Sequence, residues 1–173
     1  MTTAIRFMAA DFPKAASATA MAAILGLGVL GAAPAAAEEI IVTIESVRAL
    51  DKVDQVTAGR ADFFAVATID GKPIKSPVIK RADEIRPNSV LSAPVGRGTF
   101  DVRLELLDKD VLSKDDPIDI NRVDGKRHLD FQVNTRNCTV KGFSQGYSCR
   151  RAITRAGAEK KMAEIVFSVD VKK

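Results

Sequence analysis

Hydrophobic and polar residues alternate one by one along most of the chain after residue 38. In segment 100–106, Phe, Val and two Leu residues alternate with Asp, Arg and Glu, and segments 40–44, 128–133 and 164–172 have a similar pattern. In the last of these, Val166 is the one apolar residue on the polar face. A period of two predicts β-strands that bury one face and expose the other, as two packed sheets require.

Shorter apolar segments predict four further strands, at 62–69, 74–80, 89–94 and 118–122. Asp70-Gly71 is typical of a hairpin turn. Pro77 places the strand 74–80 at a sheet edge, because proline has no N–H for a ladder. About eight short strands indicate an all-β fold, an antiparallel sandwich rather than a closed barrel.

The segment 134–161 is predicted to be a long, basic insertion before the last strand. It contains both cysteines, Cys138 and Cys149, and its end, 153–162, is the one stretch with a helical pattern, interrupted by Gly157. In an exported chain an even cysteine number favours one disulfide, worth roughly 3 kcal/mol for so short a loop. The alternatives are two free thiols or half a zinc site, to which only His128 could add a nitrogen.

The first 37 residues are typical of a cleaved secretory signal, with a retained membrane anchor as the alternative. Arg6 and Lys14 precede an uncharged, alanine-rich run from Ala15 to Ala33, and three alanines then precede Glu38. We therefore expect residues 38–173 to form one domain. The alanine-rich signal favours a bacterial source and a periplasmic or secreted protein.

The net charge of +4 is modest, and removing Arg6, Asp11 and Lys14 lowers it to +3. This excess does not indicate a nucleic-acid partner. Cations do gather on and beside two consecutive predicted strands, as a candidate patch for anionic surfaces; the alternative is simple solvation. The patch residues are Lys72, Lys75, Lys80 and Arg81.

Two predicted loops are rich in aspartate. The first spans 50–62 and the second 108–116, and each lies next to the end of a predicted strand. Converging carboxylates repel one another unless a cation such as calcium, which prefers six to eight oxygen ligands, binds between them. Neither loop is an EF-hand, because Leu112 and Ser113 occupy the fifth and sixth positions counted from Asp108, and Val53 the third counted from Asp51. The alternative is that these residues only form turns.

These segments resemble the C2-domain family in order and spacing. Segment 41–50 followed by Asp54 is similar to the family's first strand and loop, and 61–66 to its Ser-Asp-Pro-Tyr-Val segment. Segment 85–93 has an Asn where the family has an Asn-Pro turn, and 106–116 has its D-x-D-x₅-D pattern. Phe63 replaces the usual Pro, and Asp119 stands where the family has Gly.

The resemblance implies an eight-stranded sandwich of the family's second topology, with the insertion before the last strand. It also implies calcium as a cofactor. The implied ligands are Asp54, Asp62, Asp108, Asp110 and Asp116, with Asp51 and Asp115 as spare carboxylates.

No catalytic constellation is expected. Residues 142–146 match G-x-S-x-G, but they lie between the two cysteines, and the only histidine, His128, precedes them. The chain has no Trp and one Tyr, too few aromatic platforms for a glycosidase groove. No glycine-rich phosphate loop is present, and no small-molecule substrate is expected.

The sequence therefore predicts a non-enzymatic, exported, calcium-binding module that contacts an anionic membrane surface or a protein partner through its Asp-rich loops. The alternative is a metal-free structural or interaction scaffold of the bacterial envelope.

Overall fold

The computed structural model describes residues 37–51, 61–80, 83–110 and 114–173. The chain divides into two units, Met1–Ala33 and Pro34–Lys173, and every described residue belongs to the second. Within the described residues there is no helix that is long and apolar enough to cross a membrane. The predicted signal segment, apart from its last residue Ala37, lies outside the described part and stays a prediction.

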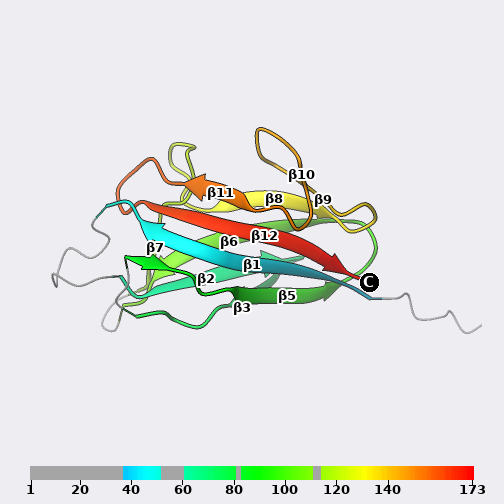
Figure 1. Ribbon diagram of the computed structural model, residues 1–173, viewed down its shortest axis with the longest axis horizontal. Coiled ribbons are helices and arrows are strands. Elements are labelled where there is room, and N and C mark those ends of the chain that lie inside the picture. The colour runs from blue at the N-terminus through cyan, green and yellow to red at the C-terminus, as the bar shows by residue number, and fades with distance from the viewer. Residues whose placement is uncertain (1–36, 52–60, 81–82, 111–113) are drawn as a thin grey trace, which may run out of the picture. The chain divides into compact units, whose positions relative to one another are not determined.

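The described residues form two sheets in which every strand pair is antiparallel (Figure 1). One sheet has the order β11 (Ile153–Ala156), β12 (Ala163–Lys172), β1 (Glu38–Ala49), with β4 (Glu84–Ile85) and β5 (Ser89–Val95) both beside β1. The other has the order β10 (Tyr147–Ser148), β9 (Thr139–Lys141), β8 (Leu129–Asn134), β6 (Thr99–Asp108), β2 (Phe63–Ile69), β3 (Lys72–Lys75), with β7 (Asp116–Ile118) beside β6.

The first and last strands pair in the middle of their sheet, as the predicted topology requires. In β1, Ile40, Val42 and Ile44 are at most 1% exposed and face the other sheet. The register with β12 then shifts between Ile44 and Ser46, a β-bulge that restores the inward orientation at Val47. Facing strands of both sheets supply the rest of one continuous apolar core.

The predicted all-β sandwich is confirmed, and four short strands, β4, β9, β10 and β11, add to the eight expected ones. Two predicted boundaries are wrong. The strand expected at 74–80 ends at Lys75, before Pro77, and the strand expected at 118–122 ends at Ile118. Beyond it, Asp119 and Ile120 form hydrogen bonds with the loops around them.

The helical prediction for 153–162 is also wrong. Residues 153–156 form β11, whose Ile153 is paired with Phe167 of β12 and is 1% exposed. Pairing with a long buried strand outweighs the helix propensity of this Ala- and Lys-containing segment.

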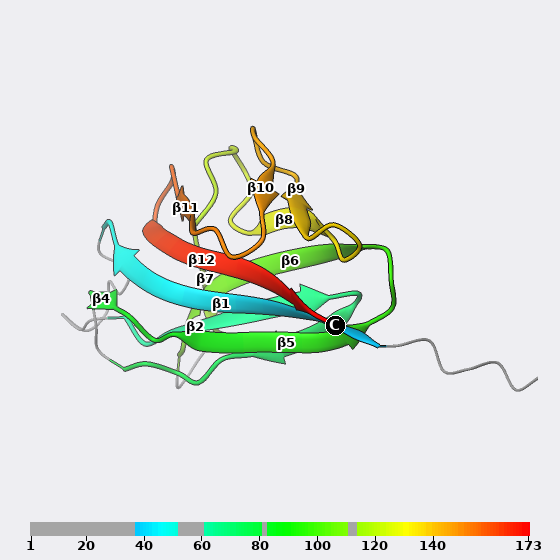
Figure 2. The same cartoon turned by 45° about the vertical axis from the view of Figure 1, so that its right-hand side comes forward.

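The insertion between β8 and β12 covers one side of the sandwich (Figure 2). The predicted disulfide between Cys138 and Cys149 is present. Between the two cysteines, Phe143 packs against Phe131 of one sheet and Phe167 of the other, with ring centroids 5.5 and 6.3 Å apart. The residues that matched G-x-S-x-G thus form a bend that places an aromatic side chain between the sheets.

Two aspartates hold the turn between β11 and β12, residues 157–162, which we call the clamped turn. Asp119 is 1% exposed, and its Oδ2 accepts the backbone N–H groups of Ala158 and Glu159, both at 2.8 Å. Asp51 accepts those of Lys161 and Met162 at 2.9 and 2.6 Å. The turn is therefore fixed by carboxylates from two other parts of the chain.

Replacing Gly157 by alanine should destabilise the protein. A Cβ atom at this position would collide with the backbone oxygen of Asp119 and lie 2.7 Å from its Cγ atom, so the clamped turn would have to move away. Overpacking of this kind costs about 2 kcal/mol. The measurement is the free energy of unfolding in urea.

Gly146→Ala is the matched control, because its Cβ would meet only the Val140 oxygen at 3.7 Å. Its effect should stay within about 0.5 kcal/mol. Equal stabilities of the two variants would contradict the close packing of Gly157 on Asp119.

Candidate functional site

The ends of β2, β6 and β7 bring three predicted calcium ligands to one end of the sandwich. Phe63 pairs with Asp108, and Asp108 pairs with Asp116, so the closeness of Asp62, Asp108 and Asp116 follows from the register of adjacent strands. The described end of the first Asp-rich loop therefore lies beside the two described ends of the second. We call Asp62, Asp108, Asp110, Asp115 and Asp116 the aspartate rim.

Asp62 and Asp108 are joined by hydrogen bonds at the start of the second loop. The backbone N–H of Asp62 donates to Asp108 Oδ1 at 2.7 Å, and the N–H of Lys109 donates to the Asp62 backbone oxygen at 2.9 Å. Asp108 is 7% exposed, which is unusual for a carboxylate. Burial of Asp108 beside Asp62 makes this the part of the rim where negative charge is least screened by water.

Lysine side chains contact the second loop. Lys161 Nζ from the clamped turn contacts Asp116 Oδ2. Lys109 Nζ lies 2.7 Å from Asp115 Oδ1, which also accepts the N–H of Asp110 at 3.3 Å. The hydrogen bond from Lys109 holds the pKa of Asp115 below its usual value, assisted by that N–H and by the charge of Lys75. Among the contacts between described residues, Asp115 and Asp116 thus each have an ammonium partner.

The remaining predicted ligands have different positions. Both oxygens of Asp51 accept backbone hydrogen bonds from the clamped turn, so this residue anchors β12. Asp54 lies in segment 52–60 and Arg81 in segment 81–82, both outside the described residues. For calcium, the rim residues are of a suitable type, since carboxylate oxygens are its preferred ligands. Within the described ranges, however, no three His, Cys, Asp or Glu side chains are grouped as a metal site.

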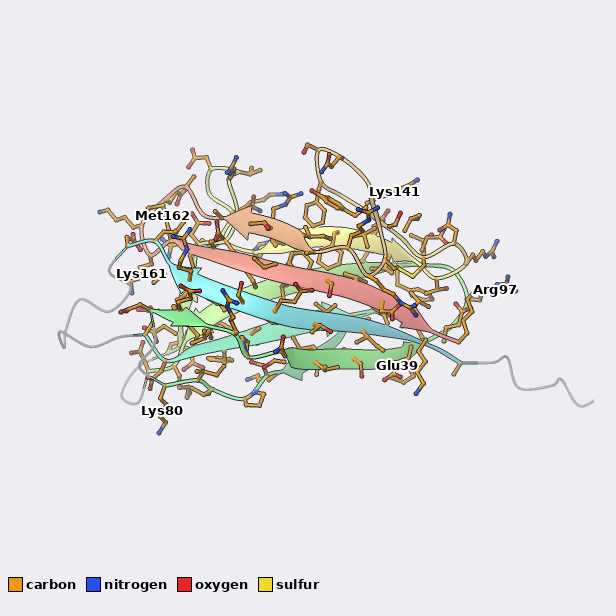
Figure 3. The ribbon with its side chains drawn as sticks, in the orientation of Figure 1. Glu39, Lys80, Arg97, Lys141, Lys161 and Met162 are labelled. Atoms are coloured by element: carbon orange, nitrogen blue, oxygen red, sulfur yellow. A yellow bond between two sulfur atoms is a disulfide. The ribbon has the colours of Figure 1, made fainter. Side chains whose placement is uncertain are left out.

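The predicted basic residues lead toward this rim. Lys72 and Lys75 lie on the edge strand β3, exposed to solvent, and Lys80 follows it. Ile79 bridges to Phe63, next to Asp62, so the chain carries Lys80 to the rim end. Figure 3 shows Lys80 and Lys161 at the same end of the sandwich, with Glu39 and Arg97 at the other.

Sequence reasoning missed the role of Asp119. Besides Ala158 and Glu159, its carboxylate accepts the N–H of Asn121 at 2.9 Å, and its backbone N–H and C=O bond to Lys161 and Ala163. The available signal was an aspartate between two apolar residues, Ile118 and Ile120, at a position where the family has glycine. A buried charge at such a position must be fully hydrogen-bonded.

A cleft of about 500 Å³ lies beside the insertion, and Asp130, Ser144 and Arg155 are among the residues that line it. His128 Nε2 lies 3.1 Å from Asp130 Oδ2, but no hydrogen bond links Ser144 to His128 in the described part of the chain. Arg155 stacks on Phe143 at 4.2 Å from the ring centroid. Burial opposes ionisation of Asp130, but hydrogen bonds from Arg103 and His128 lower its pKa overall. Asp130 and Arg155 thus have structural partners, and their contacts do not pair Ser144 with a base.

No family model matches the chain, and no curated protein matches it in sequence. Its fold is similar to several solved structures. One is described as a C2 domain, with 11% identity, a TM-score of 0.53, and coverage of 79% of this chain and 99% of that one. Another is a C2 domain of plant Extended Synaptotagmin 1, with 12% identity, a TM-score of 0.53 and coverage of 78% and 93%.

Human GIVD cytosolic phospholipase A2 is also similar, with 10% identity and a TM-score of 0.52. The match covers 79% of this chain but spans only 16% of the phospholipase chain. A calcium-bound structure of two C2 domains of Extended-Synaptotagmin 2 has 14% identity and a TM-score of 0.51, with coverage of 77% and 45%. The described part of the chain has the fold of a C2 domain.

Proposed function

We propose that the protein is an exported, non-catalytic C2-type module that binds calcium at the aspartate rim and thereby attaches to an anionic lipid surface. The observation that carries this proposal is the meeting of Asp62, Asp108 and Asp116 at one end of the sandwich, through the β2–β6–β7 register. Carboxylates gathered from separate loops favour a hard cation over other ligands.

The residues that would hold calcium are Asp62, Asp108, Asp110 and Asp116, together with Asp54. Bound calcium supplies positive charge and coordination positions that accept phosphate or carboxylate oxygens. The chain contributes the rest: Asp108 is held by the Asp62 amide, and Lys72, Lys75 and Lys80 lead along one edge to the rim. A lipid surface is favoured over a protein partner because this cationic edge is continuous with the rim.

The second candidate, a metal-free scaffold, is favoured by one observation. Lys161 and Lys109 contact Asp116 and Asp115, so part of the rim is already neutralised within the chain. In that case the sandwich would serve as an interaction scaffold without a bound cation.

Calcium should raise the melting temperature of the purified protein relative to a chelator. At about 100 times the dissociation constant, the stabilisation is about 2.7 kcal/mol by mass action. The double variant Asp108→Asn/Asp110→Asn should lose this rise in melting temperature, because it removes two negative charges from the rim. Asparagine at 108 can still accept the hydrogen bond from the Asp62 N–H, so the local structure should be kept. Thermal melts and calorimetric titration measure both effects.

Asp70→Asn is the control, since Asp70 is exposed at the opposite end of β2 and has a positive φ that asparagine tolerates. It should keep the full shift. A melting temperature that is the same in calcium and chelator would favour the scaffold.

Binding to vesicles that contain phosphatidylserine should depend on both calcium and the edge strand. Each lysine near an acidic surface adds about 1 kcal/mol, so Lys72→Gln/Lys75→Gln should weaken binding roughly 30-fold in co-sedimentation. The control variant Lys126→Gln/Lys141→Gln also removes two lysine charges, at exposed positions outside β3, and it should weaken vesicle binding less. Equal losses would argue against a defined lipid-binding edge.

The predicted signal should be removed on export. Mass spectrometry of protein recovered from the periplasm or the medium should give a chain that starts at Glu38, and the full-length mass in those fractions would contradict the proposed processing.

A further inference from the structure

Lys161 differs from the other surface lysines in how it is held. Its side chain is 25% exposed and contacts Asp116, which is 45% exposed, whereas the side chain of Lys109 is 47% exposed and its partner Asp115 is 23% exposed. Figure 3 shows Lys161 at the rim end of the sandwich, beside Met162. The two pairs are similarly exposed as a whole, but Lys161 is the more buried of the two ammonium groups and comes from a different loop than its partner.

The backbone, rather than the ion pair, places Lys161. Its N–H is bound by Asp51 and its carbonyl accepts the N–H of Asp119 at 2.8 Å. Its φ is 59°, in the left-handed region that a lysine adopts only when the surrounding structure imposes it. The clamped turn thus presents this ammonium to the rim in advance, at some conformational cost.

We propose that Lys161 is a built-in counter-ion of the aspartate rim that sets its affinity for calcium. In the calcium-free protein Lys161 neutralises Asp116, and it must release this carboxylate before Asp116 can act as a ligand. The inference rests on the proposed calcium site, because it assigns a competitor to that site. It also makes a separate claim, that the rim is stabilised by this lysine when no calcium is bound.

The test compares Lys161→Met with Lys160→Met. Methionine keeps a similar unbranched length and removes the charge, and Lys160 is the exposed neighbour in the same turn. Calorimetric titration with calcium chloride should give a dissociation constant about tenfold lower for Lys161→Met than for the unmodified protein, because an ion pair no longer has to be broken and a repelling charge is gone. Lys160→Met should change it about twofold or less.

A second readout needs no calcium. In chelator, the melting temperature of Lys161→Met should fall below that of Lys160→Met, because Asp116 loses its partner. Lys161→Arg retains the charge and should keep both the weak calcium affinity and the chelator melting temperature. Should Lys161→Met fail to fold in chelator, the arginine variant and Lys161→Gln supply the same comparison.

The outcomes separate this inference from the proposed function. Tighter calcium binding by Lys161→Met than by the unmodified protein supports both. Binding by Lys161→Met alone supports the counter-ion and overturns calcium binding by the natural chain. Equal affinities of the two proteins support the calcium site and overturn the counter-ion. No binding by either, with unchanged melting in chelator, overturns both.

Discussion

The antiparallel register of β2, β6 and β7 is the constraint on which the rim depends. Because Phe63 is opposite Asp108 and Asp108 is opposite Asp116, the apolar core that fixes this register also fixes where the carboxylates lie. A shift by one residue would turn Leu104 and Leu106 out of the core, where both are at most 2% exposed. The backbone positions of Asp108 and Asp116 are therefore fixed by the same register as the core.

The aspartate side chains of this protein have two kinds of partner: some accept backbone N–H groups, and others contact lysine side chains. Asp51 and Asp119 accept backbone N–H groups and join distant segments, so their charge is met by oriented peptide dipoles. Asp115 and Asp116 have ammonium partners at a wetter surface. Asp51 and Asp119 hold the clamped turn. Asp115 and Asp116 are the carboxylates whose ion pairs a bound cation would have to break. Asp51 and Asp119 also position Lys161, because the clamped turn that they hold presents this lysine to Asp116.

Much of the fold could be predicted from the sequence because β1, β6, β8 and β12 keep the one-by-one alternation of strands that bury one face in the core. The errors lie where tertiary contacts decide. Segment 153–162 has a helical composition, but Ile153 is buried against β12. The aspartates at 62, 108 and 116 could be placed together from strand ends. The role of Asp119 could not, because nothing in the local pattern identifies the N–H groups of Ala158 and Glu159 as its partners, about 40 residues later.

An internal counter-ion has opposite effects on the two states of an acidic rim. Without calcium, adjacent carboxylates repel one another, and the proposed counter-ion Lys161 would relieve part of this repulsion through its contact with Asp116. At the proposed calcium site the same ammonium would have to be displaced, so the free energy that it gave to the calcium-free state would be subtracted from binding. If the protein is exported, as proposed, weak binding would suffice, because calcium sites of extracellular modules have dissociation constants of roughly 10⁻⁴ to 10⁻³ M. On this proposal Lys161 keeps folding independent of calcium, and attachment to a surface would follow only where calcium is abundant.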